Sequence, residues 1–151
     1  MRLMTKIATG VLSAAIAGAG VTMAAAPANA ATGSCGAGYH YLKGKNHFPV
    51  KYGKKVGGYA DLYFSSSTGK NCAIVRASGS ASHITVLLAR YDSKNKAPEK
   101  TVTDGWGKGQ NYHSYAGPVK LWAKGRCISV VGSLMKSGHR YQGGGIKVHC
   151  G

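Results

Sequence analysis

Five lysines and two tyrosines are interleaved within residues 43–59, a mixture that suits an anionic polymer. A lysine ammonium group supplies a point charge for a phosphate or carboxylate, and a tyrosine ring offers a flat face on which a base or a sugar can stack. The same residues would also fit a charged, solubilising surface with ordinary sheet tyrosines. The candidate binding residues are Lys43, Lys45, Lys51, Tyr52, Lys54, Lys55 and Tyr59.

Acid–base catalysis is the second chemistry that the residue types allow. A secreted ribonuclease needs a histidine with a glutamate or a second histidine, and a cation on the phosphate. No spacing selects a pair among the six histidines, and Glu99 lies in a lysine-rich segment where we expect it to be solvated. The histidines are His40, His47, His83, His113, His139 and His149.

The chain has few carboxylates that could take part in catalysis. Glycoside hydrolysis usually needs two carboxylates, and the chain has only four acidic residues. We expect Asp61 to be exposed on the outward face of a strand and paired with a neighbouring lysine. The motifs of serine hydrolases and of nucleotide-binding proteins are absent from the sequence. We therefore expect no catalytic residues and no enzymatic activity.

The four cysteines predict two disulfides. An even number of cysteines in a small exported chain is typical of disulfide bonding. The sequence contains no CxxC or HxxxH pair, so we expect neither a metal site nor a cofactor. We favour Cys35 with Cys72 and Cys127 with Cys150, while a clamp of Cys35 with Cys150 and Cys72 with Cys127 stays open.

An export signal is predicted at residues 1–30. Two positive charges precede an uncharged stretch at 7–26, and small residues at Ala28 and Ala30 follow a proline. We place cleavage after Ala30, which leaves 31–151 as one β-rich domain without stable membrane insertion. An uncleaved membrane anchor is the alternative interpretation.

The charge of the predicted mature domain is strongly positive. Eighteen of the 20 basic residues and all four acidic residues lie after residue 30, which gives a net charge of +14. Such a surface attracts polyanions at low salt whatever its biological role. Fourteen of the 18 cations are lysines and four are arginines, which argues against specific reading of nucleic-acid bases. Nucleic-acid contact is therefore expected to be non-specific.

Short β-strands are the elements that must position these residues. Twenty glycines after residue 30 disfavour long helices, and short runs rich in Val, Ile, Tyr, Thr and Leu alternate with turn residues. The pattern indicates an all-β fold, either a sandwich or a small barrel. The segment 93–100 is predicted as a polar loop. The predicted strands are 59–64, 72–77, 84–91, 119–123, 126–131 and 146–150.

Several short motifs, in order, resemble the spore-associated protein A family of small exported proteins of filamentous actinobacteria. They are Cys35-Gly36 with Tyr39, Leu62-Tyr63-Phe64, Thr68-Gly69-Lys70-Asn71-Cys72, Tyr115-Ala116-Gly117-Pro118-Val119, Cys127, and His149-Cys150-Gly151. The resemblance implies export and association with the cell or spore surface, and it brings no established catalytic residues.

Together these features predict a secreted, non-enzymatic protein of the cell or spore surface. Its lysines would adsorb to an anionic wall or spore-coat polymer. The alternative is a secreted cationic effector, either a ribonuclease or an antimicrobial protein.

Overall fold

The computed structural model describes residues 33–41, 46–106 and 110–150. The predicted signal at 1–30 and the candidate residues Lys43 and Lys45 lie outside this range. No helix in the described part of the chain is long and apolar enough to cross a membrane. The described strands are β1 (His40–Tyr41), β2 (His47–Tyr52), β3 (Lys55–Ser65), β4 (Lys70–Ala77), β5 (Ser82–Tyr91), β6 (Pro98–Asp104), β7 (Tyr115–Trp122), β8 (Ile128–Lys136) and β9 (His139–Val148).

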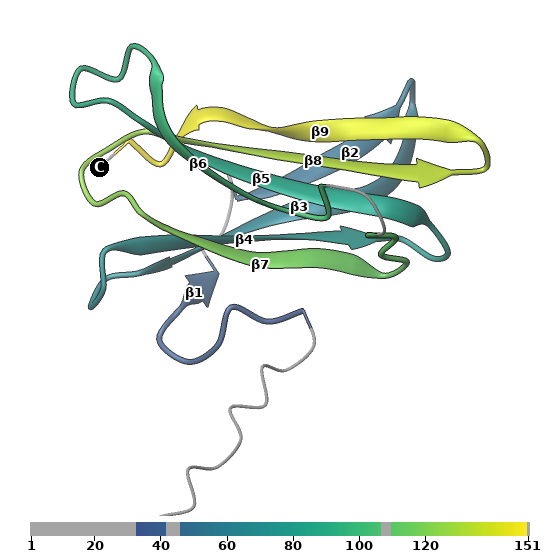
Figure 1. Ribbon diagram of the computed structural model, residues 1–151, viewed down its shortest axis with the longest axis horizontal. Helices are drawn as coiled ribbons and strands as arrows, with labels where there is room; N and C mark the ends of the chain where they lie inside the picture. The colour runs from purple at the N-terminus through teal and green to yellow at the C-terminus, as the bar shows by residue number, and fades with distance from the viewer. Residues whose placement is uncertain (1–32, 42–45, 107–109, 151) are drawn as a thin grey trace, which may run out of the picture.

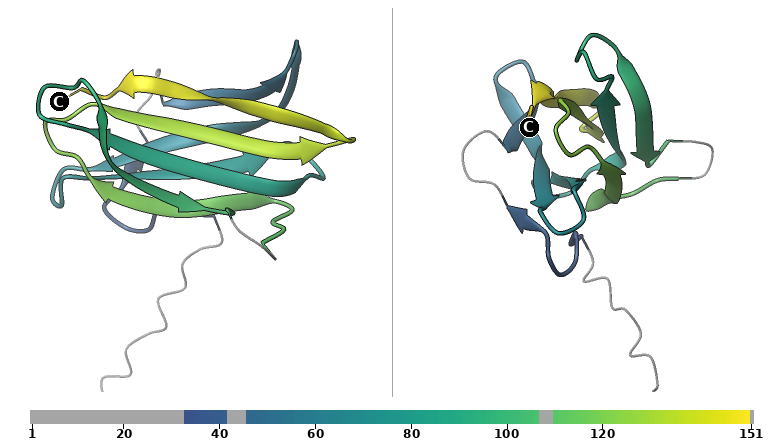
Figure 2. Two further views of the ribbon diagram at one scale, coloured as in Figure 1. Left: turned by 45° about the horizontal axis from the view of Figure 1, so that its top comes forward. Right: turned by 90° about the vertical axis from the view of Figure 1, so that its left-hand side faces the viewer.

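The strands form one antiparallel sheet that curls into a nearly closed barrel. The order across the sheet is β6-β5-β8-β9-β2-β3-β4-β7, and β1 pairs with β3 outside this path. Figure 1 shows the strands running along the molecule, and the right-hand view of Figure 2 shows them arranged around a common axis. The all-β prediction with two disulfides is confirmed, and of its two architectures the structure adopts the barrel.

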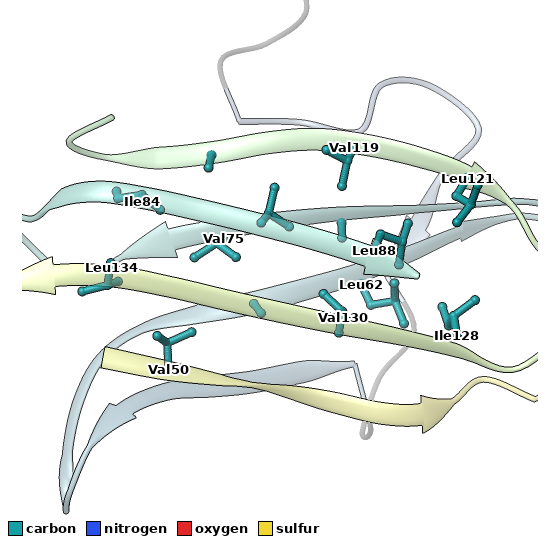
Figure 3. Packing of buried hydrophobic residues seen from close by; sticks show 14 of the residues in the cluster. Val50, Leu62, Val75, Ile84, Leu88, Val119, Leu121, Ile128, Val130 and Leu134 are labelled. Atoms are coloured by element: carbon teal, nitrogen blue, oxygen red, sulfur yellow. The ribbon is translucent and has the colours of Figure 1, made fainter. Parts of the chain in front are cut away.

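The barrel interior is filled by aliphatic side chains that alternate along each strand. On β5, Ile84, Val86 and Leu88 are fully buried, whereas Thr85 and Leu87 are partly exposed. This two-residue period is the one that a strand with one buried face requires. Figure 3 shows the packing of such side chains from Val50, Leu62, Val75, Ile84, Leu88, Val119, Leu121, Ile128, Val130 and Leu134.

The two ends of the sheet order, β6 and β7, are not joined by strand pairing in the described residues. We call the junction between these two strands the seam. Side chains bridge it instead. The Asp104 carboxylate at the end of β6 accepts hydrogen bonds from the Gly117 backbone N–H at 2.7 Å and from the Tyr112 hydroxyl at 3.1 Å. One carboxylate therefore ties both sides of the seam together.

Three consecutive glycines allow β9 to lie close to its neighbours. A Cβ at Gly143 would come within 2.0 Å of the Pro49 carbonyl oxygen on β2, and one at Gly144 within 1.9 Å of the Val130 carbonyl oxygen on β8. Real Cβ atoms do not approach so closely, so these positions require glycine. The glycines hide this strand from sequence patterns, and the prediction found only its end.

A second, smaller apolar cluster lies on the outer face of the barrel. Cys35 bonds to Cys72 on β4, and both cysteines are buried together with Ile74. Tyr39, Tyr63 and Tyr115 pack against them. The N-terminal segment 33–41 therefore covers the outer face of β3 and β4, as its position beside these strands in Figure 1 shows.

The second disulfide joins Cys127 to Cys150. The favoured pairing is thus confirmed, and the alternative clamp between the chain ends is wrong. The predicted loop at 93–100 needs correction, because Pro98 begins strand β6. Exposed polar and charged residues such as Glu99 and Lys100 can occupy this strand because it lies at an end of the sheet order.

Candidate functional site

The predicted basic residues of the β2–β3 hairpin lie at one end of the barrel. Lys51 and Tyr52 end β2, Lys54 lies in the two-residue turn, and Lys55 begins β3. Gly53, the first turn residue, has φ of +57°, as a type II′ hairpin turn requires. The three lysines and Tyr52 are all exposed.

A second hairpin lies beside the first. The β8–β9 turn at Ser137 and Gly138 follows Lys136 and precedes His139 and Arg140. The ring of His139 stacks on the ring of Tyr52, with centroids 4.4 Å apart and planes 17° from parallel. Figure 1 shows both hairpins at the end opposite the C-terminus. We call this surface the basic end and define it by Lys51, Lys54, Lys55, Lys136 and Arg140.

Tyr59, the remaining described candidate, is not part of the basic end. It pairs with Pro49 in the middle of the β2–β3 ladder. Val56, which follows the basic-end residue Lys55, lies three residues before Tyr59 on β3, a distance of about 10 Å along the strand. Its ring stacks on His47 with centroids 4.0 Å apart. The structure therefore separates Tyr59 from the lysines with which the sequence grouped it.

Asp61 belongs to a cluster with His47 and Arg76 on the outer face. The His47 Nδ1 lies 2.6 Å from Asp61 Oδ1, and Arg76 forms an ion pair with the other carboxylate oxygen. Arg76 also donates to the Gly33 carbonyl oxygen. The prediction of an exposed Asp61 paired with lysine is wrong, because the N-terminal segment packs over this face and leaves the residue only 7% exposed.

The other three carboxylates also have protein partners. Asp104 bridges the seam, and Asp92 accepts a hydrogen bond from the Lys96 backbone N–H at 2.8 Å. Glu99 forms ion pairs with Arg90 at 3.1 Å and Arg126 at 3.3 Å. Glu99 is exposed, as expected, and β6 also places it beside two arginines.

This arrangement separates the roles of arginine and lysine. Arg76, Arg90 and Arg126 bind carboxylates within the fold, whereas no described lysine lies within ion-pair distance of a carboxylate. Since the whole chain has four acidic residues and each is already engaged, the charge of the described lysines is not neutralised internally. It is available to a ligand outside the molecule.

Three titratable groups of the described part have shifted pKa values. Burial, followed by the nearby charge of Asp61, raises the pKa of Tyr41 above 10.0. Partial burial lowers the pKa of His149 below the ordinary value of 6.5. The hydrogen bond to Asp104 raises the pKa of Tyr112 above 10.0. None of the three lies at the basic end, and the described residues contain no group of three histidine, cysteine or acidic side chains placed to hold a metal ion.

Sequence reasoning missed two of the five cations that define the basic end. Lys136 and Arg140 were not among the candidate binding residues, and His139 was considered only among the histidines for catalysis, because the Gly-rich segment 132–145 was not assigned to strands. The signal that could have found them is the Ser137-Gly138 pair between Leu134 and Tyr141, a two-residue turn between apolar positions.

Comparison with known proteins agrees with the motifs quoted above. The chain is 30% identical over 124 residues to Spore-associated protein A of Streptomyces coelicolor, and the match covers 78% of this chain and 74% of that protein. No family model matches the chain. No solved structure matches it either. On the strength of its similarity to the Streptomyces protein, the chain belongs to the spore-associated protein A family.

Proposed function

We propose that this protein acts, after export, at the cell or spore surface as a non-enzymatic protein that adsorbs to anionic polymers. The relative's name supports this location, since that protein is described as spore-associated. The observation that carries the adsorption is the uncompensated lysine charge, because all four carboxylates are engaged within the fold.

The basic end is the surface we assign to this adsorption. Its five cations project from two adjoining hairpins, and none of the four carboxylates belongs to either hairpin turn. Two of the carboxylates, Asp92 and Glu99, lie in the segment between β5 and β6 and at the start of β6, toward the opposite end of the barrel. The two hairpin turns of the basic end therefore present positive charges and no carboxylate of their own.

Co-sedimentation of the protein with purified cell walls tests the proposal. Walls are compared before and after their anionic polymers are stripped, across a salt series. Binding should disappear on stripping and weaken steeply with salt, because adsorption releases counterions from the polymer. Binding that is absent, or that is indifferent to both treatments, would contradict the proposal.

A matched pair of triple variants locates the surface. Replacing Lys51, Lys54 and Lys55 by glutamine removes three charges from the basic end, and replacing Lys94, Lys96 and Lys100 removes three from the opposite end. The first variant should lose more wall binding than the second. Equal losses would show that total charge alone governs adsorption.

Ribonuclease activity is a second candidate, favoured by one arrangement. Asp61 holds the His47 ring through Nδ1, and Nε2 has no hydrogen-bond partner in the described part of the chain, so this histidine has the orientation of a general base. Arg76 is the nearby cation, although its donors already contact Asp61, Gly33 and Tyr63. RNA cleavage that is lost in His47→Ala and kept in His113→Ala would favour this function over adsorption.

A further inference from the structure

A hollow of about 400 Å³ opens at the basic end, between the start of β5 and the β8–β9 hairpin. Three of its lining residues carry nitrogen donors: His83 on β5, Lys136 on β8 and Arg140 on β9. No carboxylate lines it. Three donors from three strands thus surround one space large enough for more than a water molecule, which occupies about 30 Å³ in the liquid.

Arg140 differs from the other three arginines of the described chain. Each of those donates to a carboxylate and to a backbone carbonyl, whereas the exposed Arg140 guanidinium has no acceptor among the described residues. A guanidinium can bind two oxygens of a phosphate at once, with a geometry that lysine cannot supply. Arg140 is therefore the described arginine whose donors are available to a ligand.

Lys136 is held at the edge of the hollow. Its ammonium donates to the Ser78 carbonyl oxygen in the turn that precedes β5. An ammonium group has three hydrogens, so two further hydrogen bonds can be made. The contact fixes the position of a charge that would otherwise move with a long, flexible side chain.

His83 is held in a backbone conformation that non-glycine residues rarely adopt. Its φ is +49°, and its N–H donates to the Asn111 side-chain oxygen at 3.0 Å. Its ring Nδ1 lies 3.1 Å from the Ser82 hydroxyl oxygen. Residues in this region of φ and ψ are enriched at ligand sites, because surrounding contacts must keep them there. These contacts position the imidazole on the wall of the hollow.

We propose that this hollow binds a phosphate group of a phosphodiester polymer of the cell or spore surface. The inference rests on the proposed function and names its ligand: Arg140 binds two phosphate oxygens, and Lys136 and His83 donate from the other sides. No phenylalanine, tyrosine or tryptophan lines the described hollow, and its one aromatic ring, that of His83, is held by the contact of Nδ1 with Ser82. The lack of these larger stacking surfaces favours a polyol phosphate over RNA.

Titration of the full protein with a purified glycerol-phosphate wall polymer tests the site. Arg140→Gln should weaken binding about tenfold or more, because a charged, two-point hydrogen bond is lost. Lys100→Gln is the matched control, since it removes one charge from exposed strand β6, and it should weaken binding less than about twofold. His83→Asn, which tolerates the positive φ, should weaken binding severalfold without unfolding the protein.

Each outcome bears on a different claim. If the unmodified protein does not bind the polymer, the proposed function fails. If it binds but Arg140→Gln and Lys100→Gln lose affinity equally, adsorption stands and the phosphate site is wrong. Tighter binding to single-stranded RNA than to the wall polymer would overturn the choice of polymer class.

Inorganic phosphate alone supplies a direct readout. Saturable shifts of the Ser137 and Gly138 amide signals in NMR spectra should occur in the unmodified protein and disappear in Arg140→Gln. Unsaturable shifts, or shifts that persist in the variant, would contradict a built site.

Discussion

Asp61 on β3 and Arg76 on β4 form an ion pair that also fastens the N-terminal segment to the barrel, because the same guanidinium donates to the carbonyl oxygen of Gly33. The pair lies on the outer face, where Cys35 and Cys72 close the disulfide of the same segment. A covalent bond and a charge pair therefore act on one short stretch of chain. Together they turn an outer face of β3 and β4 into a second buried layer.

Asp61→Asn should lower the free energy of unfolding by about 1–3 kcal/mol, because it removes the partner of a partly buried arginine. Arg76 retains 37% of its side-chain exposure, so the loss should stay below that of a fully buried pair. Glu99→Gln, in a more exposed ion pair, is the control and should cost about 1 kcal/mol or less. Urea denaturation measures both variants, and equal losses would contradict a special role for Asp61.

The misplacement of Asp61 shows where sequence reasoning stopped. Period-two alternation correctly placed Asp61 opposite Ala60 and Leu62, which face the barrel interior. Alternation describes one strand, however, and cannot show that another segment will cover its outer face. His47 and Arg76 come from neighbouring strands, so their meeting at Asp61 depends on the register of β2 and β4.

The difference between a pattern within one strand and contacts between strands also explains which strands the sequence predicted. The strand at 84–91 is rich in aliphatic residues and was predicted nearly to its bounds. β2 contains Pro49 and several polar residues, and β9 contains three glycines that are explained only by contacts with β2 and β8. The basic end combines the β2–β3 and β8–β9 hairpins, so the lysines of the first hairpin were identified, whereas Lys136 and Arg140 of the second were not.

Removal of the Cys35–Cys72 disulfide by the double substitution Cys35→Ser and Cys72→Ser should destabilise the protein by about 3–4 kcal/mol. The bridge closes a loop with a sequence separation of 37, and closing such a loop restricts the unfolded chain. Thermal unfolding measures the loss. Proteolysis should cut the segment 33–41 before the barrel in this variant, and an unchanged cleavage pattern would show that the segment is held without the bridge.

Gly144→Ala should destabilise the barrel by about 3 kcal/mol, since its Cβ would lie 1.9 Å from the Val130 carbonyl oxygen. Gln142→Ala is the control on the same strand, because Gln142 is exposed and should tolerate truncation within about 0.5 kcal/mol. Denaturant titration distinguishes the two. A tolerated Gly144→Ala would mean that β9 can move away from β8 at little cost.

Asp104→Asn should lower the pKa of Tyr112 toward 10.0. The Tyr112 hydroxyl donates to the Asp104 carboxylate, and this hydrogen bond favours the protonated phenol. Absorbance at the tyrosinate band during an alkaline titration measures the shift, with Asp92→Asn as the control. If the two variants titrate alike, the Tyr112 to Asp104 bond does not persist in solution.

His149→Gln should flatten the loss of stability on acidification. Partial burial beside Phe64, with ring centroids 4.9 Å apart, lowers the pKa of His149 in the folded protein, whereas the unfolded chain keeps the ordinary value near 6.5. At pH values between these two pKa values, the unfolded chain therefore binds more protons than the folded protein. The stability contributed by the neutral imidazole is therefore complete above about pH 6.5 and is lost as the pH falls toward the pKa of His149 in the folded protein.

Thermal unfolding of the variant and of the unmodified protein from pH 7.5 to pH 5 measures this difference, with His113→Gln as the control. Parallel curves for His149→Gln and the unmodified protein would show that the ring is solvated, and that the hollow formed by Phe64, Ala123 and His149 is open to water.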